Sequence, residues 1–353
     1  MKNICIFTQS LNNGGSEKQA VQLANSLVEK YNVTILVYYG DQVVGSLLCK
    51  INDNRIRLIR LKGCALKKVY DIFSIFIKED YFVVFCYLLL PNFLGGVVGR
   101  LAGVPYTIGG IRSSKIDRHK VLLNKMLQNY INYLTIYNNY AGVEKLSSLG
   151  FNKAKAYVIP NCHETEIDTI VREDRKIKEI LSVGRFHFSK DYRTALKSIA
   201  YLKNKQLIRY TIIGYGEMLG NIREWVEEFE LTDLVRIVIK PNNLEYYYRK
   251  ADIFLQTSIF EGLSNTVMEA MSYSLPVVTT KVGDNEKLVK DGISGYLCEP
   301  GDYAGIAISL DKLINDYFLR LNMGAEGYSI LNANYTIPVF RERYFEFIRM
   351  LNG

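Results

Sequence analysis

The stretch FEGLSNTVMEAM, from Phe260 to Met271, lies between two short apolar runs, ADIFLQT before it and LPVVTT after it. Short apolar runs bounded by turn residues are typical of buried strands. Ser264 and Asn265 are good helix N-caps, and the residues after them have apolar positions at helical spacing. The stretch therefore predicts a strand, a loop, a helix and another strand, which together form a βαβ unit of a parallel sheet.

The same alternation of apolar runs and helical patterns continues over nearly the whole chain. It begins at NICIFTQ, pauses in a polar segment between Cys162 and Lys176, and starts again at IKEILSVGRF. A chain of 353 residues is long enough for two domains. We therefore predict an α/β protein with two doubly wound, Rossmann-like domains, residues 1–165 and 166–336, and a ligand cleft between them.

The net charge of +8 is distributed unevenly along the chain. Residues 1–165 contain 20 Lys and Arg against 10 Asp and Glu, whereas residues 166–353 contain 24 against 26. The positive first half indicates an acidic partner, and nucleic acid, anionic lipid or a phosphate-bearing substrate would all fit. Nucleic acid is the least favoured of these, because the sequence has no RNP-like or helix-turn-helix signature.

The cysteines and the longest apolar segment indicate a cytosolic protein without a membrane span. The six cysteines are scattered and form no CxxC pair, which is typical of reduced thiols. The segment FVVFCYLLLPNFLGGVVG has 18 uncharged residues, near the lower limit for a spanning helix, but Pro91 and Asn92 interrupt it. We predict instead a buried strand at Phe82–Tyr87, a turn, and a short helix capped near Asn92.

Two strand ends carry groups that are suited to phosphate. Gly14 and Gly15 lie between a strand and a helix, where backbone N–H groups and the helix dipole favour an anion, although a plain turn would look the same. Arg185 and Lys190 follow a strand that ends in Gly184, and two cations at that position would neutralise a diphosphate. The alternative for these two is a solvated surface pair.

The two glutamates of the opening stretch, Glu261 and Glu269, are eight positions apart. On one continuous helix they would differ by about 80° around the axis and would not act together. Gly262 favours a turn, so we place Glu261 on the loop and Glu269 in the second helical turn. The N–H groups at Ser264 and Asn265 then lie between them, which predicts a site for a sugar and a phosphate together. The alternative is two solvated carboxylates, one of which favours the helix dipole.

No catalytic triad or metal-binding cluster is evident in the sequence. The three histidines, His119, His163 and His187, are far apart in the sequence and receive no role. The motif DxD does not occur, so a nucleotide-sugar site that depends on a divalent cation is not expected, and no cofactor is expected either.

Together these segments resemble the retaining glycosyltransferases of glycosyltransferase family 4, which have the GT-B fold. The run EGLSNTVMEAMSYSLPVVTTKVGDNEKLVKDGISGYLCEPGD is similar to the most diagnostic region of that family, including its EX7E motif. ILSVGRFHFSKDY, IIGYGE and ADIFLQTS precede it in the expected order, and NGGSEKQA matches the GGxE loop. The resemblance spans nearly the whole chain and is most specific from Ser182 to Asp302. It also implies that a helix at 337–353 returns to the first domain.

The resemblance implies two groups of site residues. Catalytic roles would fall to Arg185 and Lys190, which would bind the diphosphate and stabilise the leaving group, and to Glu261, which would contact the sugar hydroxyls. The donor would also be held by Gly14, Gly15, Gly184, Ser264, Asn265 and Glu269. Within this second group, Glu269 would bind the ribose hydroxyls.

The chain departs from the family in the first domain. A histidine beside the donor sugar is common in the family, and Gly109 stands at that position in YTIGGIRSS. Arg112 is a candidate for part of the role, as a contact to acceptor or donor. The missing histidine keeps open a catalytically degenerate partner of another transferase, and a nucleotide-sugar epimerase is a second alternative.

The resemblance implies retaining transfer of a sugar from a nucleotide sugar, with UDP-sugars the default, to a glycan or an undecaprenyl-diphosphate-linked saccharide. The product would be a bacterial surface polysaccharide, such as lipopolysaccharide or capsule. Basic residues beside the amphipathic segments VYDIFSIF and LLNKMLQNYINYL favour docking on an anionic membrane, with ordinary solvated lysines as the alternative. We expect a cytoplasmic protein, peripheral on the inner face of the cell membrane.

Overall fold

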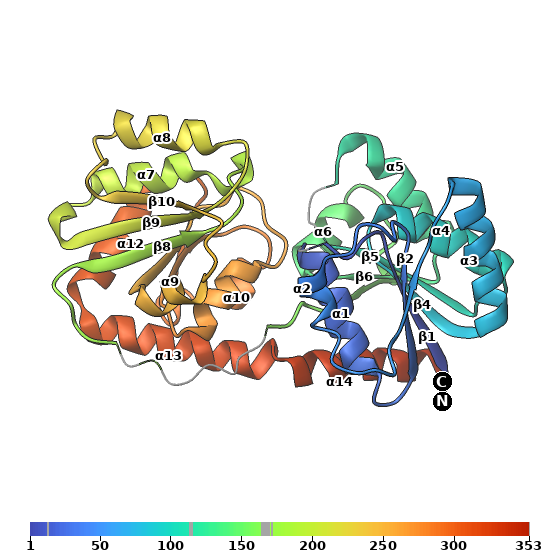
Figure 1. The fold of residues 1–353 in the computed structure, drawn as a ribbon. Helices are drawn as coiled ribbons and strands as arrows, with labels where there is room; N and C mark the ends of the chain where they lie inside the picture. Colours follow the sequence, from blue (N-terminus) through green and yellow to red (C-terminus); the bar gives the residue numbers. More distant parts are fainter. Residues whose placement is uncertain (13, 113–115, 164–169, 171, 353) are drawn as a thin grey trace. The chain divides into compact units, whose positions relative to one another are not determined.

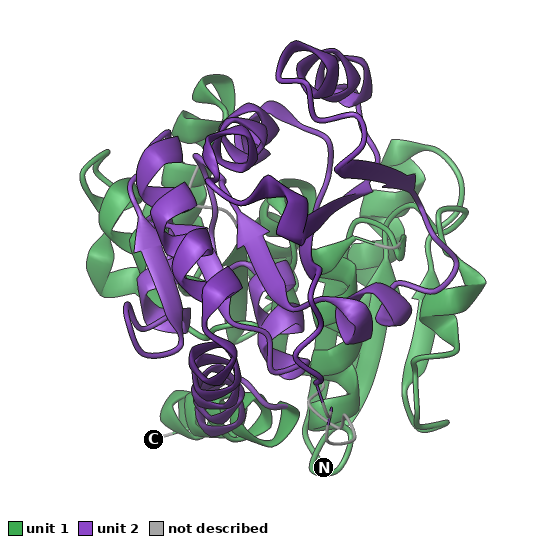
Figure 2. Cartoon of the chain, turned by 90° about the vertical axis from the view of Figure 1, so that its left-hand side faces the viewer, with its two compact units in different colours: residues 1–162, 337–353 green, residues 163–336 purple. Residues whose placement is uncertain are grey.

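The computed structural model describes all residues except 13, 113–115, 164–169, 171 and 353. The chain divides into two compact units (Figures 1 and 2). Unit 1 comprises Met1–Cys162 and Ile337–Gly353, and unit 2 comprises His163–Thr336. The division falls after residue 162, whereas the sequence pattern placed it after residue 165.

Unit 1 is built on a seven-stranded sheet in the order β3-β2-β1-β4-β5-β6-β7, and its paired strands are parallel. The strands are β1 (Asn3–Thr8), β2 (Asn32–Val37), β3 (Arg57–Arg60), β4 (Tyr81–Cys86), β5 (Tyr106–Ile111), β6 (Leu134–Tyr137) and β7 (Ala156–Val158). The helices between them are α1 (Gly15–Leu27), α2 (Gly45–Leu48), α3 (Ala65–Glu79), α4 (Leu89–Leu101), α5 (Arg118–Met126) and α6 (Tyr140–Ser147).

One more helix of unit 1, α14 (Ile337–Asn352), follows unit 2 in the sequence and packs against α1. Its buried aromatic side chains enter the core of unit 1. The ring of Tyr344 meets Phe85 of β4 edge-on at 5.6 Å, and the ring of Phe347 lies 4.8 Å from that of Tyr157 in β7. The core of unit 1 therefore contains residues from both ends of the sequence.

Unit 2 contains a six-stranded sheet in the order β10-β9-β8-β11-β12-β13, again with parallel pairs. Its strands are β8 (Lys178–Val183), β9 (Ile208–Gly214), β10 (Val235–Ile239), β11 (Ile253–Gln256), β12 (Val277–Thr280) and β13 (Gly295–Cys298). Its helices are α7 (Tyr192–Tyr201), α8 (Leu219–Glu228), α9 (Glu245–Lys250), α10 (Asn265–Ser272), α11 (Asn285–Leu288), α12 (Tyr303–Asn315) and α13 (Tyr317–Asn334).

The two sheets share one topology. In each, the first strand lies between the second and the fourth, so the strand order reverses beside the first strand. Parallel strands of this kind are buried on both faces, which explains why β1, β2, β4, β8 and β11 consist mostly of buried residues. The prediction of two doubly wound α/β domains is confirmed. The ligand cleft between them stays a prediction.

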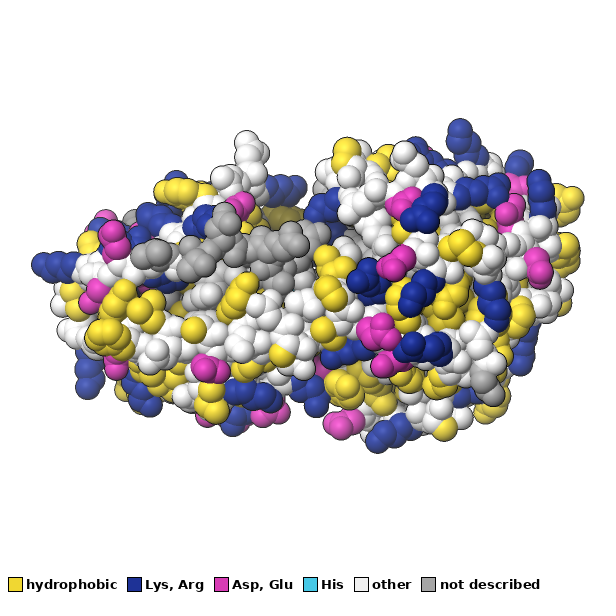
Figure 3. All heavy atoms as spheres, turned by 90° about the horizontal axis from the view of Figure 1, so that it is seen from below, with side chains coloured by type: hydrophobic (Ala, Val, Ile, Leu, Met, Phe, Trp, Pro, Cys, Tyr) yellow, Lys and Arg dark blue, Asp and Glu magenta, His cyan; other side chains and the backbone are white. Residues whose placement is uncertain are grey.

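No helix of the described residues is both long enough and apolar enough to cross a membrane. The uncharged segment Phe82–Gly99 instead lies in β4 and α4. Figure 3 shows one face of the molecule, on which Lys and Arg side chains lie among hydrophobic ones.

The start of α4 differs from the prediction. The helix begins at Leu89, three positions before the expected cap at Asn92. Pro91 is tolerated because it lies in the first turn, where its missing N–H has no partner to lose. Asn92 has another function: its side chain donates to the carbonyl of Gly110 at 3.0 Å and accepts from the N–H of Gly110 at 2.9 Å. Asn92 therefore fastens α4 to β5.

Replacing Asn92 by alanine is expected to lower the free energy of unfolding by roughly 2–4 kcal/mol, because two buried backbone groups of Gly110 lose their partner. Urea unfolding followed by far-UV circular dichroism measures the change. Asn129 is the matched control, since it makes the same pair of bonds at the surface, to the Gly150 carbonyl and the Asn152 N–H. Water can replace these bonds, so Asn129→Ala should cost much less; equal losses would contradict the interpretation.

Candidate active site

In unit 2, the loops that follow β8 and β11 lie side by side because the two strands are paired, with Phe254 opposite Leu181. Hydrogen bonds join the loops directly. The N–H of Ile259 donates to the carbonyl of Ser189 at 2.8 Å, and the hydroxyl of Thr257 donates to the carbonyl of Asp191 at 2.9 Å. The carboxyl edge of the sheet therefore has a fixed geometry at the point where the strand order reverses, which is where ligands bind in doubly wound sheets.

Lys190 and Glu261 meet at this edge. The ammonium of Lys190 lies 2.5 Å from Oε1 of Glu261, and the Ser258 hydroxyl donates to the same oxygen at 2.7 Å. The two side chains are largely buried, with exposed fractions of 19 % and 13 %. The sequence assigned these residues to different parts of the ligand, the diphosphate and the sugar, and the structure brings them into contact.

Gly184 is closely packed between the side chains of Tyr192 and Lys190. The Tyr192 hydroxyl donates to the Gly184 carbonyl at 3.1 Å. A Cβ on Gly184 would lie 3.1 Å from that hydroxyl oxygen and 3.4 Å from the side chain of Lys190, and a Cβ on Gly214 would lie 1.9 Å from the Gly184 carbonyl. Burial, with nearby Tyr210 and Glu261, raises the pKa of Tyr192, so its hydroxyl stays a donor at neutral pH.

The Arg185 side chain lies at the surface and is not part of the Lys190–Glu261 pair. Its side chain is 64 % exposed, and its guanidinium lies 3.8 Å from the carboxylate of Glu217. His187 is a structural residue of the same loop: its Nδ1 accepts from the N–H of Ser189 at 3.2 Å and caps a short 3₁₀ turn. Arg185 is thus available to an incoming anion at the surface, whereas Lys190 is already held in place.

The helix start predicted at Ser264 or Asn265 falls at Ser264, the N-cap of α10. Its hydroxyl accepts from the N–H of Val267 at 3.4 Å and from the side-chain amide of Gln256 at 2.9 Å. Asn265 is the first residue of the helix, and the bond from Gln256 joins this helix start to the end of β11.

Sequence reasoning missed the polar residues that support this helix start. Gln256, Thr279 and Asn285 are buried, and the Asn285 amide donates to the Thr279 hydroxyl at 3.0 Å and to the Thr280 carbonyl at 3.1 Å. The available signal was the occurrence of polar residues at the ends of the apolar strands β11 and β12. Such residues are retained in a core only when they are hydrogen-bonded.

Glu269 lies in the second turn of α10, as predicted, and it is held by another helix. The hydroxyl of Tyr248 in α9 donates to its carboxylate at 2.8 Å, and the ring of Tyr248 stacks on Tyr273 at 5.1 Å. Burial, followed by the charge of Glu269, raises the pKa of Tyr248, so this donor stays protonated. The carboxylate therefore has a fixed orientation, and its contact with a ribose stays a prediction.

In unit 1, the loop after β1 contains an interaction that the sequence did not reveal. The carboxylate of Glu17 accepts from the hydroxyl of Ser10 at 3.1 Å and from that of Ser16 at 2.6 Å. A Cβ on Gly14 would lie 2.3 Å from Oε2 of Glu17. Gly14, the N-cap of α1, therefore leaves room for a carboxylate of the protein itself. Gly15 is the first residue of the helix, and the contact of both glycines with a donor phosphate stays a prediction.

Arg112 follows β5 in the interior of unit 1. Its guanidinium carbon lies 4.3 Å from the ring centre of Tyr87, and its Nη2 donates to the hydroxyl of Tyr344 in α14 at 3.5 Å. Among the described residues, its buried Nε and Nη1 have no hydrogen-bond partner. The structure thus shows that Arg112 contacts α14, and the predicted contact with a substrate stays untested.

The position of the absent family histidine has no room for a side chain. A Cβ on Gly109 would lie 2.6 Å from the side-chain amide of Asn132 and 3.2 Å from the hydroxyl of Thr135. A Cβ on the neighbouring Gly110 would lie 2.4 Å from the carbonyl oxygen of Cys86. Gly110 is therefore required by its packing against the backbone of β4, and a side chain at Gly109 would need Asn132 to shift.

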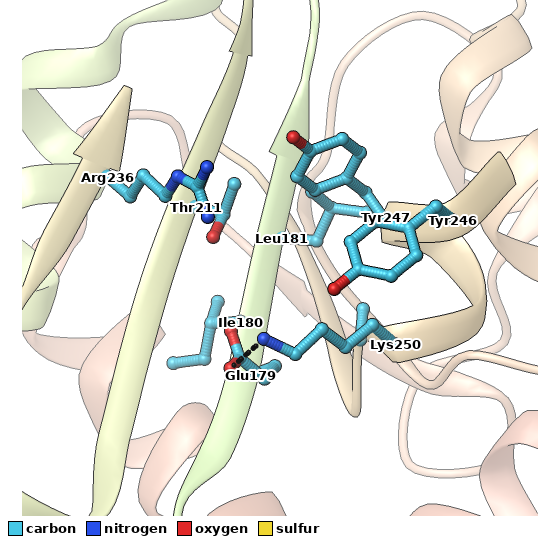
Figure 4. A pocket seen from close by; sticks show the side chains of 9 residues that line it. Glu179, Ile180, Leu181, Thr211, Arg236, Tyr246, Tyr247 and Lys250 are labelled. Atoms are coloured by element: carbon cyan, nitrogen blue, oxygen red, sulfur yellow. Dashed lines mark ion pairs between the residues drawn. The ribbon is translucent and has the colours of Figure 1, made fainter. Parts of the chain in front are cut away.

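A small hollow lies elsewhere on unit 2, between α9 and the strands β8, β9 and β10 (Figure 4). Lys250 and Glu179 form an ion pair at 2.9 Å on its wall, and Tyr246 and Tyr247 point from α9 toward the strands. It adjoins the first residues of β8 rather than the carboxyl edge, so it is separate from the candidate site. Within the described part of the chain, His, Cys, Asp and Glu form no cluster that would hold a metal ion.

Comparison with known proteins gives the class of this protein. Residues 163–330, nearly all of unit 2, match the family model described as glycosyl transferases group 1. The chain is thus a glycosyltransferase with the GT-B fold, and unit 2 carries its group 1 domain. The resemblance noted from the sequence is confirmed at this level.

Relatives match over nearly the full length of the chain. One is the lipopolysaccharide core biosynthesis glycosyltransferase LpsE of Rhizobium meliloti, 23 % identical over 95 % of this chain and 96 % of the relative. Another is the N-acetylgalactosamine-N,N'-diacetylbacillosaminyl-diphospho-undecaprenol 4-alpha-N-acetylgalactosaminyltransferase of Campylobacter jejuni, 27 % identical over 91 % and 92 %. The crystal structure of Anabaena Alr3699/HepE in complex with UDP and glucose has the same fold, with a TM-score of 0.84, 14 % identity and coverage of 99 % and 100 %.

Replacing Lys190 by methionine is expected to destabilise unit 2 by roughly 1–3 kcal/mol, because the largely buried Glu261 carboxylate loses its cation. Adding Glu261→Gln should restore most of that loss. Urea unfolding followed by the fluorescence of Trp225, the single tryptophan, reports on unit 2. The exposed pair Lys281–Glu299, removed in the same two steps, is the control and should show a coupling below about 1 kcal/mol. A double variant no more stable than Lys190→Met would contradict the coupling.

Gly14→Ala is expected to destabilise unit 1 by about 1 kcal/mol, because the new methyl group shifts the end of the Glu17 side chain and weakens its hydrogen bonds from Ser10 and Ser16. Gly45→Ala is the control, since a Cβ there meets nothing within 4 Å. Glu17→Ala alone loses the hydrogen bonds from Ser10 and Ser16, so the informative quantity is the cost of Gly14→Ala in a Glu17→Ala background, measured in urea. That cost should be close to zero; a cost equal to that in the wild-type background would show that Glu17 is not the reason for the glycine.

Proposed function

We propose that the chain is a retaining glycosyltransferase of family 4 that transfers a sugar from a UDP-sugar to a saccharide carried on a lipid diphosphate, in the synthesis of a bacterial surface polysaccharide. The observation that carries the proposal is the ion pair of Lys190 with Glu261 at the reversal point of the unit 2 sheet. It places a cation and a hydrogen-bond acceptor within reach of one ligand. The names of several relatives, which include diphospho-undecaprenol acceptors, support the proposed substrate class.

The donor's diphosphate is bound by cations and by a helix start. An ammonium has three N–H groups, and among the described residues Lys190 uses one of them on Glu261. It can therefore bind a phosphate oxygen without leaving its carboxylate. Arg185 adds a second, exposed cation, and the backbone N–H groups at Ser264 and Asn265 add the positive end of the α10 dipole. These charges stabilise the leaving diphosphate without a metal ion or other cofactor.

Glu261 holds the sugar rather than attacking it. Its carboxylate already accepts from Lys190 and Ser258, which lowers its nucleophilicity and leaves it suited to accepting hydrogen bonds from sugar hydroxyls. Retention then follows from displacement on one face. The bond from the anomeric carbon to the phosphate oxygen breaks, the bond to the acceptor oxygen forms on the same side, and the acceptor proton passes to the departing diphosphate. Glu269, oriented by Tyr248, binds the ribose.

The acceptor's lipid places the reaction at a membrane. Unit 1 carries the excess of positive charge, and an undecaprenyl-diphosphate carrier lies in a bilayer with anionic headgroups. The protein accordingly works in the cytoplasm, bound peripherally to the inner face of the cell membrane.

The proposal is tested by incubating the purified protein with UDP-sugars and a lipid-diphosphate-linked saccharide, with detection of released UDP and of the new glycoside. Arg185→Ala and Glu261→Gln should lower kcat/KM by about 100-fold, because each removes a group that binds the transition state. Arg193→Ala, an exposed arginine of the same unit, should not. Proton NMR of the product should show the anomeric configuration of the donor.

Three results would overturn parts of the proposal. Unchanged rates in Arg185→Ala and Glu261→Gln would remove the assigned site. An inverted product would remove retention. Conversion of the nucleotide sugar without an acceptor would favour an epimerase.

A further inference from the structure

Helix α3 of unit 1 has an apolar stripe on its exposed side. Leu66, Tyr70 and Ile77 are 84 %, 70 % and 54 % exposed, and their spacing places them on one side of the helix. Val69 and Phe73 lie beside them, the first exposed and the second half-buried. A surface helix of a globular protein normally presents polar residues on this side, so the stripe requires an explanation.

The inner side of α3 is firmly packed, so the stripe is not a core face turned outward. Ile72 and Phe76 are fully buried in the unit 1 core. The ammonium of Lys68 lies 4.6 Å and 5.1 Å from the ring centres of Tyr38 and Tyr39, close enough for cation–π attraction to both. Rotation of α3 to bury the stripe would break all of these contacts. The apolar surface of α3 therefore continues from the buried side through Phe73 to the exposed stripe, and it is wider than the part that the core covers.

Lysines border the stripe along the flank that faces away from the core. Lys62, Lys67 and Lys78 are exposed on or just before α3, whereas the acidic residues of the helix already have partners. Asp71 pairs with Lys67 at 2.7 Å, and Glu79 pairs with Arg57 of the edge strand β3 at 2.8 Å. Lys62 and Lys78 remain, against the exposed Asp80 at the C-cap of α3, so one positive charge is left over. A helix with apolar residues on one side and lysines along its flanks is typical of segments that lie in the interface of an anionic bilayer.

We propose that the exposed face of α3 is the surface by which unit 1 docks on an anionic lipid bilayer. Leu66, Tyr70 and Ile77 enter the boundary between headgroups and acyl chains, where the amphipathic tyrosine ring is well accommodated. Lys62 and Lys78 contact lipid phosphates at the headgroup level. This inference deepens the proposed function, because it names the part of the protein that brings it to a lipid-linked acceptor (Figure 1).

The first test is cosedimentation with vesicles of phosphatidylglycerol and phosphatidylcholine, and with vesicles of phosphatidylcholine alone. Wild-type protein should bind the anionic vesicles at low salt and dissociate as salt rises. The triple variant Leu66→Gln, Tyr70→Gln, Ile77→Gln should bind at least about tenfold more weakly, since it loses three buried apolar side chains. The matched control replaces three exposed apolar residues of unit 2, Tyr201, Ile308 and Phe318, and should bind like wild type.

A second test locates the contact. With Trp225 replaced by phenylalanine, a tryptophan is introduced at Leu66 in one variant and at Ile308 in another. The fluorescence of Leu66→Trp should shift to the blue with anionic vesicles and be quenched by brominated lipids, and that of Ile308→Trp should not. Equal behaviour of the two, or wild-type vesicle binding by the triple variant, would overturn the proposal and leave α3 as the binding face for a protein partner.

Failure of this inference is distinguishable from failure of the proposed function. The triple variant should transfer sugar to a short, water-soluble acceptor at the wild-type rate, because α3 carries none of the assigned site residues. Loss of vesicle binding with intact soluble transfer supports both proposals. Vesicle binding through α3 by a protein that releases no UDP would support the docking surface and remove the transferase assignment.

Discussion

The ion pair between Lys190 and Glu261 is the contact on which the candidate site of unit 2 depends. The two residues come from loops that are 71 positions apart, and only the pairing of β8 with β11 brings those loops together. Backbone bonds between the loops fix the distance, and Ser258 fixes the carboxylate. A lysine held in this way loses little conformational entropy when an anion arrives, which is the advantage of preorganised charge.

The same principle applies to the helix start beside the pair. Gln256, Thr279 and Asn285 bury amide and hydroxyl groups beneath α10, and hydrogen bonds offset the cost of removing them from water. The Ser264 hydroxyl is consequently held by the Gln256 side chain as well as by the Val267 N–H of its own helix. The site is thus built in two layers, with charged groups at the edge and a neutral polar network behind them.

The sequence predicted the features that depend on local pattern. The alternation of apolar runs with helical patterns predicted the parallel α/β architecture, and the N-cap residue Ser264 predicted the start of α10. It missed what depends on partners distant in the chain: the contact of Lys190 with Glu261, the hydrogen bond from Tyr248 to Glu269, and the carboxylate of Glu17 beside Gly14. It also placed the start of α4 too late, because Pro91 reads as a helix breaker unless the helix has only just begun.

The return of α14 to unit 1 has a consequence for synthesis on the ribosome. Unit 2 is encoded between the two segments of unit 1, so its whole sequence emerges before α14 does. The core of unit 1 needs Phe340, Tyr344 and Phe347 to cover β4 and β7, whereas unit 2 has all of its core residues by then. Unit 2 can therefore complete its folding before unit 1 does. Until α14 is synthesised, unit 1 exposes the apolar surface that α14 later covers, and a chaperone can bind that surface.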